Sequence, residues 1–454
     1  MIKSLGDLKF QDIYFRNNTY SRFKIISLID HLASYLKKNT HSDSPFIMLA
    51  TFNHIKTIIA YYAILKIGKI AVIIDPKYKT FELIEIISDS DPAAIIFINS
   101  NTLNFDYEEE IVFRKTNPKF EIQSDLADVC TLIYTNAEDG HAKAAMLTKK
   151  NLIAEINIMR FCKVIEDNSI SCILLPFHHA FGLLEGILVP THSDSSLLIV
   201  DIDLYKFESI INEIFKYKIT HFVSIPSVYY LMSKIPDIGH HLKFMNKLSS
   251  GGYKLPSLVF NNFFNRTGKK IHEGYGLTEA APGCIMHSHL EDEIKIESIG
   301  KALPCCEIKI VDKNNNKCML NETGEICIKG DNIFKGYFNK EHITKKVLID
   351  GWLHSGDMGS IDEKNYIYFK GLKKKMINVG GINVYPKELE RLMKLNKNVT
   401  YVKITNQNSL IQGEIVIANI KLKKESKNAR ELFKNWCYEN ITNSKLPKIW
   451  NFIN

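Results

Sequence analysis

Residues 274–279 (Gly-Tyr-Gly-Leu-Thr-Glu) combine residue types that can handle a phosphate. The two glycines would let a ligand approach the backbone closely. The Thr278 hydroxyl can contact a phosphate, and the Glu279 carboxylate is a hard oxygen ligand for Mg²⁺. A tight turn capped by a threonine would use the same residues. The motif alone therefore leaves both interpretations open.

Two further segments also fit both a functional and a purely structural interpretation. Residues 352–357 (Trp-Leu-His-Ser-Gly-Asp) end in Asp357, whose carboxylate could accept both hydroxyls of a ribose, although by itself it is typical of a β-turn aspartate. Residues 371–375 are a basic joint that precedes Gly380 and Gly381. Such a joint suits a small domain that swings a loop into an active site. It equally suits a solvated linker before an ordinary helix.

The order of these motifs along the chain carries more information than any one of them. Residues 134–143 (Tyr-Thr-Asn-Ala-Glu-Asp-Gly-His-Ala-Lys) follow an apolar run and precede a predicted helix, where a phosphate loop belongs. With this fourth motif, nearly the whole chain resembles the adenylate-forming superfamily of acyl-CoA synthetases, luciferases and peptide-synthetase adenylation domains. It is most similar to fatty-acyl and aryl-CoA ligases. Smaller similarities lie at residues 75–76, 175–182, 250–252 and 298–304.

The resemblance implies an AMP-forming ligase that activates a carboxylic acid with ATP and transfers the acyl group to a thiol. Its cofactors would be ATP/AMP, Mg²⁺, and either CoA or a carrier-protein phosphopantetheine. Its partners would be a small carboxylic acid and, for the second acceptor, an acyl carrier protein.

The resemblance also implies roles for individual residues. On the nucleotide side these are Thr135, Gly140 and Lys143 in the phosphate loop, Thr278 at the α-phosphate, Glu279 as metal ligand, Gly251, Gly252, Tyr253, Tyr275 and Gly276 around the adenine, and Asp357 at the ribose. On the acid and thiol side these are His179 at the carboxylate, Lys374 as the hinge, and Gly380 and Gly381 beside the pantetheine channel. Further candidates for the acid pocket are Phe177, His178, Phe181 and Ala281.

The phosphate loop departs from the family pattern. The family has hydroxyl and glycine residues followed by Pro-Lys-Gly, whereas this chain has Asn-Ala-Glu-Asp at 136–139 and alanines on both sides of Lys143. A close pair of like charges could cost roughly 4 kcal/mol in a partly screened site. Glu138 and Asp139 would therefore oppose a triphosphate.

Two other positions differ as well. Leu372 stands where the family has a nucleotide-binding arginine. Residues 443–454 resemble the segment before the family's catalytic Gly-Lys motif, and neither Lys445 nor Lys448 matches that lysine. Loss of such a charge-stabilising donor is worth about 3 kcal/mol or more. These departures predict an impaired adenylation step. The alternative is a pseudoenzyme that binds AMP or an acyl-adenylate, or a partner that performs only thioester formation.

The elements expected to position these residues alternate between helices and short apolar strands. The 3.6-residue pattern predicts helices at 21–36, 53–67 and 81–88, and apolar runs predict strands at 46–49, 70–74, 94–98, 173–175, 197–200 and 221–225. This alternation indicates α/β architecture with parallel sheets in two βαβ-type subdomains. A small β section is expected from about residue 298, with strands at 308–311, 325–329 and 366–369. A small mobile α+β domain with strands at 402–405 and 414–421 should follow, so that the expected domains are 1–373 and 374–454.

Composition narrows the class of protein. The 454 residues are 45% hydrophobic and 24% charged, with a dispersed net charge of +8 and no nucleic-acid-binding motif, which argues against a nucleic-acid partner. Nine cysteines without a Cys-x-x-Cys pair favour a reducing compartment over disulfides or structural zinc. Lysines interrupt the most apolar long stretch, 55–74, so that a membrane span is not expected. A cytoplasmic location is expected.

Overall fold

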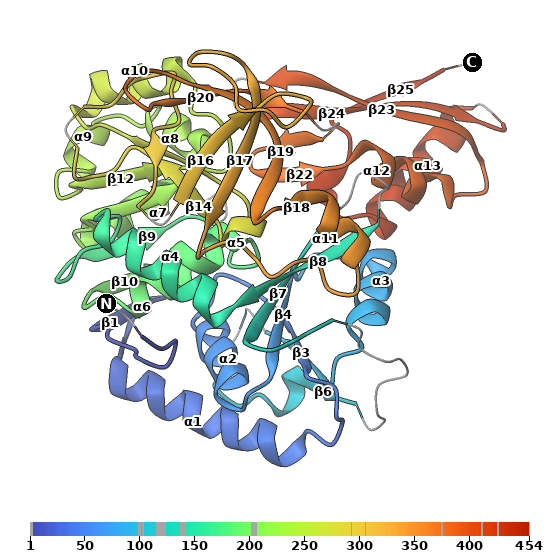
Figure 1. Ribbon diagram of the computed structural model, residues 1–454. Helices are drawn as coiled ribbons and strands as arrows, with labels where there is room; N and C mark the ends of the chain where they lie inside the picture. The colour runs from blue at the N-terminus through green and yellow to red at the C-terminus, as the bar shows by residue number, and fades with distance from the viewer. Residues whose placement is uncertain are drawn as a thin grey trace.

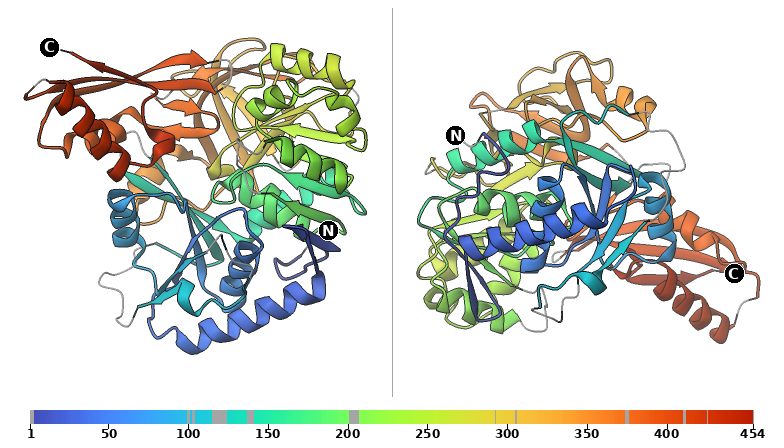
Figure 2. Two further views of the ribbon diagram at one scale, coloured as in Figure 1. Left: turned by 180° about the vertical axis from the view of Figure 1, so that it is seen from behind. Right: turned by 90° about the horizontal axis from the view of Figure 1, so that it is seen from below.

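The alternation of helices and short apolar strands produces four β-sheets and the helices that cover them (Figure 1). The computed structural model describes residues 3–98, 101, 104–114, 124–136, 141–200, 207–291, 293–304, 306–373, 376–409, 412–424 and 426–453, except for the side chain of Asn136. Across these residues the sheets have nine, six, five and five strands. Figure 2 shows the C-terminal part standing out at one corner of the molecule.

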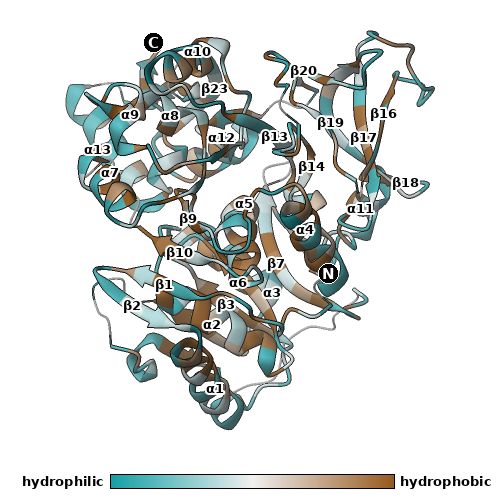
Figure 3. Ribbon diagram, turned by 90° about the vertical axis from the view of Figure 1, so that its left-hand side faces the viewer, coloured by the Kyte–Doolittle hydropathy of each residue, from teal (hydrophilic) through white to brown (hydrophobic). Residues whose placement is uncertain are grey.

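The six-stranded sheet has the order β6-β5-β3-β4-β7-β8. Its strands are β3 (Phe46–Ala50), β4 (Ile70–Ile74), β5 (Ala94–Phe97), β6 (Ile111–Phe113), β7 (Val129–Asn136) and β8 (Ala142–Thr148). The four central strands run parallel, and β6 and β8 pair antiparallel at the edges. Every residue of β3 and β4 is buried, as expected for parallel strands that are covered on both faces. Figure 3 shows β3 and β7 coloured as mostly hydrophobic.

The nine-stranded sheet has the order β15-β14-β13-β12-β11-β9-β10-β1-β2. Its strands are β1 (Asp12–Phe15), β2 (Asn18–Ser21), β9 (Ile170–Ile173), β10 (Ser196–Ile199), β11 (His221–Ser224), β12 (Lys247–Ser250), β13 (His272–Gly276), β14 (Gly283–Met286) and β15 (Lys301–Ala302). The parallel run from β1 to β13 carries antiparallel strands at its edges. The expected α/β class with parallel sheets is therefore confirmed.

The helices of the described residues are α1 (Arg22–Asn39), α2 (Ile55–Lys66), α3 (Thr80–Ser90), α4 (Lys149–Phe161), α5 (Ala180–Leu183), α6 (Val189–Thr191), α7 (Phe207–Lys216), α8 (Pro226–Met232), α9 (Ile238–His241), α10 (Ser257–Thr267), α11 (Glu341–Val347), α12 (Pro386–Lys394) and α13 (Lys427–Asn440). The three helices predicted at 21–36, 53–67 and 81–88 are confirmed as α1, α2 and α3. Short single turns are η1 (Glu108–Glu110), the π-turn η2 (Leu184–Leu188), η4 (Thr278–Ala280) and η5 (Asn443–Lys445). The Ser21 hydroxyl caps α1 by accepting a hydrogen bond from the Lys24 amide, which satisfies one otherwise unpaired donor.

One expected local structure is different. Residues 134–143 are predicted to precede a helix, but residues 134–136 end β7, residues 142–143 begin its antiparallel partner β8, and α4 begins only after β8. Lys143 consequently sits within a strand, opposite Thr135. A short polar segment between apolar runs gives no sequence signal that distinguishes a hairpin from a strand-to-helix loop.

Two smaller sheets complete the fold. The first contains β16 (Cys306–Val311), β17 (Gly324–Gly330), β18 (Leu348–Ile349), β19 (Trp352–Ile361) and β20 (Ile367–Leu372). The second contains β21 (Ile377–Val379), β22 (Ile382–Val384), β23 (Val399–Ser409), β24 (Gly413–Leu422) and β25 (Ile449–Phe452), packed with α12 and α13 around a separate apolar core. The β section and the C-terminal α+β section expected from the sequence are both present.

Two findings concern the chain as a whole. No helix of the described residues is long and apolar enough to cross a membrane. The eight cysteines that the structure describes are all free thiols.

Candidate active site

A cavity of about 1250 Å³ opens where the nine-stranded sheet, β19 and the C-terminal sheet meet. Most of the residues singled out from the sequence line it. These are Thr135, Lys143, His179, Gly252, Tyr253, Tyr275, Gly276, Thr278, Glu279, Asp357, Gly380 and Gly381. Gly140 and Lys374 lie outside the described residues. Segments up to 246 residues apart in sequence, from Thr135 to Gly381, therefore share one space.

Lys143, Glu279 and Tyr337 form a buried cluster at one end of the cavity. The Lys143 Nζ lies 3.4 Å from Glu279 Oε1 and donates a hydrogen bond to the Tyr337 hydroxyl. That hydroxyl donates to Glu279 Oε1 at 2.5 Å. Burial and the Glu279 carboxylate raise the pKa of Tyr337 above its usual value, so that the phenol stays protonated and donates. The cluster holds a cation and a carboxylate side by side where the sequence predicts the phosphates.

The sequence analysis did not identify Tyr337. It reaches the cluster because the segment around it pairs with β8: Ala145 bridges to Tyr337, and the Phe338 amide donates to the Ala144 carbonyl at 2.9 Å. Tyr337 lies beyond β17, far from Lys143 in sequence. A tyrosine next to a glycine in a loop gives no signal of such a pairing.

Asp357 and Tyr275 come from neighbouring sheets and bind each other. The Tyr275 hydroxyl donates to Asp357 Oδ2 at 2.6 Å. The Ser355 hydroxyl accepts from the Asp357 backbone amide at 3.0 Å, which orients the part of β19 that carries the carboxylate. Asp357 is 7% exposed and lines the cavity, so its carboxylate faces a confined space in which diol hydroxyls can be recognised.

Gly276 of the 274–279 motif and Gly251 are both required by close contacts within the chain. A Cβ on Gly276 would lie 1.8 Å from the carbonyl oxygen of Pro282. This glycine is therefore required by a close approach of its own chain, and it also lines the cavity, so that its contact with a ligand stays a prediction. A Cβ on Gly251 would lie 2.9 Å from the ring of Phe181. Gly251 does not itself line the cavity, but it makes room for a ring that does.

His179 borders the cavity at the N-terminus of α5, next to His178. The His178 Nε2 lies 3.5 Å from Asp75 Oδ2, which joins two of the smaller sequence similarities. Burial lowers the pKa of His178 to about 4 and that of His179 to about 3. His179 is therefore a neutral imidazole at neutral pH and can offer a hydrogen bond without positive charge. His178, Phe177 and Ala281, also considered for the acid pocket, do not line the cavity, whereas Phe181 does.

Gly380 and Gly381 form the two-residue turn between β21 and β22. Their φ angles of 61° and 90° both lie in the left-handed region that a tight hairpin of this kind requires. The turn is anchored by the Gly380 amide, which donates to the Gln412 carbonyl at 2.7 Å, and by the Gly381 amide, which donates to Asn378 Oδ1 at 2.8 Å. The side-chain Nδ2 of Asn378 in turn donates to the Gly252 carbonyl at 3.1 Å. The hairpin therefore touches the nine-stranded sheet at the cavity.

Glu279 was predicted to bind a metal. Within the described residues there is no cluster of three or more His, Cys, Asp or Glu side chains that could hold an ion alone. A single carboxylate fits Mg²⁺, which is usually held by one or two carboxylates together with substrate phosphates and water. The donor set thus fits an ion that arrives with a nucleotide.

Comparisons with known proteins show the family and the fold of this chain. A family model described as AMP-binding enzyme matches residues 11–338. Among similar proteins, a long-chain-fatty-acid–CoA ligase of Salmonella typhimurium is 26% identical over 448 residues, covering 86% of this chain and 78% of the ligase.

Two solved structures share the fold. A double mutant of o-succinylbenzoate CoA synthetase from Bacillus subtilis, bound with its product analogue, matches with a TM-score of 0.84 at 21% identity, covering 99% of this chain and 93% of the synthetase. ATP-bound MatB from Rhodopseudomonas palustris matches with a TM-score of 0.71 at 22% identity, covering 98% and 92%.

Proposed function

Because the chain belongs to the AMP-binding enzyme family, we propose that this AMP-forming ligase joins an apolar carboxylic acid to CoA through an acyl-adenylate. The observation that carries the proposal is the shared cavity. Asp357, Glu279 and Lys143 line it from the N-terminal part, and the Gly380–Gly381 hairpin lines it from the C-terminal part. One space can then serve both half-reactions, with the adenylate passed on without release.

The nucleotide half of the site uses Asp357 for the ribose hydroxyls. The Tyr275 hydroxyl donates to Asp357 Oδ2 and so holds the carboxylate in the orientation that accepts from the ribose diol. Gly252 and Tyr253 supply the backbone and ring for the adenine. The φ of +86° at Gly252 is a backbone conformation that other residues rarely adopt.

The phosphate half uses Thr278, Glu279 and Lys143. The acid's carboxylate oxygen attacks the α-phosphorus, the bond to the β-phosphate oxygen breaks, and pyrophosphate leaves with that electron pair. Thr278 binds the α-phosphate, and Lys143 places positive charge beside the leaving group. Mg²⁺ held by Glu279 and the phosphates would supply further positive charge. Tyr337 keeps the Glu279 carboxylate in position.

The acid is proposed to be apolar because of apolar residues that line the same cavity as His179. The lining there is aliphatic and aromatic, and comprises Leu174, Leu175, Pro176, Ala180, Phe181, Ile225, Val228 and Leu231. The nearby Lys254 is bound by Glu273 Oε2 at 2.7 Å and by the Ser298 carbonyl at 3.3 Å. Lys254 is thus already paired, and a second carboxylate buried among these apolar residues would be costly. The fatty-acid ligase relative favours the same class.

This proposal predicts discrimination between acids of equal length. With ATP, Mg²⁺ and CoA, the full chain should form the thioester of octanoate at least about 100-fold faster than that of octanedioate, because burying an unpaired carboxylate is so costly. The measurement is mass-spectrometric detection of the two thioesters. Equal rates, or preference for the diacid, would show that the aliphatic lining does not contact the acid's far end.

The thiol acceptor is proposed to be CoA, as in the relatives. The channel beside the hairpin is rich in side-chain amides from Asn378, Asn383, Asn406, Asn408 and Gln412. These groups suit the two amides of a pantetheine arm. A carrier-protein phosphopantetheine would present the same arm, so comparing CoA with a loaded carrier protein in the thioester assay distinguishes the two acceptors.

We also propose that residues 374–454 form a mobile domain with its hinge at Lys374. In this proposal, the arrangement in which the hairpin lines the cavity serves thioester formation. The higher TM-score with the synthetase bound to a product analogue than with ATP-bound MatB supports this view.

A second candidate is a chain in which only thioester formation survives. Leu372 favours it, because this apolar residue lines the cavity and pairs with Asp357 across β19 and β20. The family resemblance places an arginine there. Against this candidate, Lys143 reaches Glu279 although the surrounding loop sequence is altered.

A further inference from the structure

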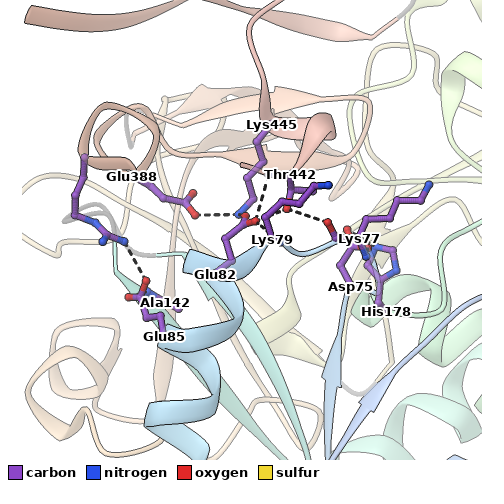
Figure 4. A network of polar contacts seen from close by, with 11 residues as sticks. Asp75, Lys77, Lys79, Glu82, Glu85, Ala142, His178, Glu388, Thr442 and Lys445 are labelled. Carbon is purple, nitrogen blue, oxygen red and sulfur yellow. Dashed lines mark hydrogen bonds and ion pairs between the residues drawn. The ribbon is translucent and has the colours of Figure 1, made fainter. Parts of the chain in front are cut away.

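Glu82, in the first turn of α3, is the centre of a buried contact with the C-terminal part of the chain (Figure 4). Its Oε1 accepts a hydrogen bond from Lys445 Nζ at 2.6 Å. Its Oε2 accepts from the Thr442 amide at 3.2 Å and from the Thr442 hydroxyl. The side chains of Glu82 and Lys445 are 5% and 7% exposed. This ion pair is therefore formed away from water, between parts of the chain 363 residues apart.

Lys445 has a second partner within its own domain. Its Nζ donates to Glu388 Oε1 on α12 at 2.9 Å. If the C-terminal domain moves away, the Lys445–Glu388 pair can travel with it, whereas every contact between Glu82 and this domain is broken. Glu82 would then keep its capping contact with the Lys79 amide and lose its C-terminal partners, whereas Lys445 would keep Glu388.

Neighbouring contacts act in the same place. Arg391 on α12 pairs with Glu85 one turn further along α3 at 3.0 Å. The Phe81 ring contacts the Trp436 ring of α13, with centroids 6.2 Å apart. At the other end of the interface the side-chain Nδ2 of Asn378 donates to the Gly252 carbonyl. The described contacts of the domain thus lie at α3 and beside the cavity, and the ion pairs are those with α3.

We propose that Glu82 is a positioning residue for thioester formation: its carboxylate holds the C-terminal domain where the Gly380–Gly381 hairpin lines the cavity. The proposal rests on the proposed function, because it assigns Glu82 to the second half-reaction only. Glu82 does not line the cavity and touches no reacting group. Its effect must therefore be transmitted through Thr442 and Lys445.

Glu82→Gln tests the proposal. The amide keeps the shape of the side chain and removes the charge, and Lys445 stays paired with Glu388. Thioester formation from a synthetic acyl-adenylate and CoA should slow about tenfold, the size of a typical coupling between two states of a protein. Acid-dependent exchange of pyrophosphate into ATP should stay within about twofold of the unaltered chain, because that half-reaction does not use this arrangement.

Glu110→Gln is the matched control. Glu110 pairs with Lys56 at 2.5 Å, and the two side chains are 8% and 0% exposed, so a buried glutamate–lysine pair is broken within the N-terminal part alone. The control should lower the melting temperature without separating the two half-reactions. If Glu82→Gln slows both half-reactions equally, or leaves thioester formation unchanged, the proposal is wrong.

Hydrogen exchange gives a readout that does not need activity. In Glu82→Gln the amides of α12 and the first turn of α3 should exchange faster than in the unaltered chain, and in Glu110→Gln they should not. Unchanged protection in Glu82→Gln would contradict the proposed role. If the unaltered chain forms no thioester while Glu82→Gln still shows this loss of protection, the proposed function is overturned and the domain contact stands.

Discussion

Replacing Glu279 with glutamine should lower acid-dependent pyrophosphate exchange by roughly 100-fold or more, the size of effect seen when a charge-stabilising group is removed from an active site. A neutral amide is a poor ligand for Mg²⁺ and leaves the charge of Lys143 uncompensated at the phosphate end. Thioester formation from a preformed acyl-adenylate should change by less than about threefold, since no pyrophosphate leaves in that step.

Tyr337→Phe provides the matched comparison for this result. It removes the hydroxyl that donates to Glu279 and keeps the ring, which packs against Phe334 with centroids 4.9 Å apart. The carboxylate remains, so the loss of exchange should be about tenfold, the worth of one hydrogen bond to a charged group. If Glu279→Gln retains full exchange with its melting temperature unchanged, Glu279 has no part in adenylation.

Asp357→Ala should weaken AMP binding by about 100-fold or more, because two hydrogen bonds from ribose hydroxyls to a carboxylate are lost. Titration calorimetry with AMP measures the effect. Tyr275→Phe should weaken AMP binding less, because it removes the hydroxyl that fixes Asp357 and leaves the carboxylate able to accept from the ribose.

An AMP analogue without ribose hydroxyls tests the same role of Asp357. The unaltered chain should bind AMP far more tightly than 2′,3′-dideoxy-AMP, and Asp357→Ala should bind the two alike. A variant that still prefers AMP to the dideoxy analogue would show that another group recognises the ribose.

Much of the architecture follows from local sequence patterns. The strands 46–50 and 70–74 are continuous apolar runs between helices of clear 3.6-residue periodicity, and they form the parallel centre of a sheet as expected. The Gly380–Gly381 pair lies in a turn because both residues adopt left-handed φ angles. In these elements the local pattern and the tertiary packing demand the same structure.

What the sequence could not predict depends on contacts between distant segments. Tyr337 contacts Lys143, which lies 194 residues away in sequence, and Glu82 contacts Lys445, which lies 363 residues away. Neither contact has a local signature. Lys445 was considered only as a catalytic lysine that failed to match, whereas the structure gives it a buried place in the interface and leaves Lys448 at the cavity.

The altered phosphate loop shows a related limit. Its central residues, 137–140, lie outside the described part of the chain, so the predicted repulsion from Glu138 and Asp139 stays a prediction. The flanking strands nevertheless bring Thr135 and Lys143 to the cavity. The scaffold around the loop is thus retained where the motif itself diverges.

The central claim is that this chain activates a carboxylic acid with ATP. Exchange of labelled pyrophosphate into ATP by the full chain, with Mg²⁺ and with or without octanoate, tests it most directly. The account predicts that label enters ATP when octanoate is present and not when it is omitted. Absence of exchange from a chain that still binds AMP would contradict the claim and leave thioester formation from a supplied adenylate as its chemistry.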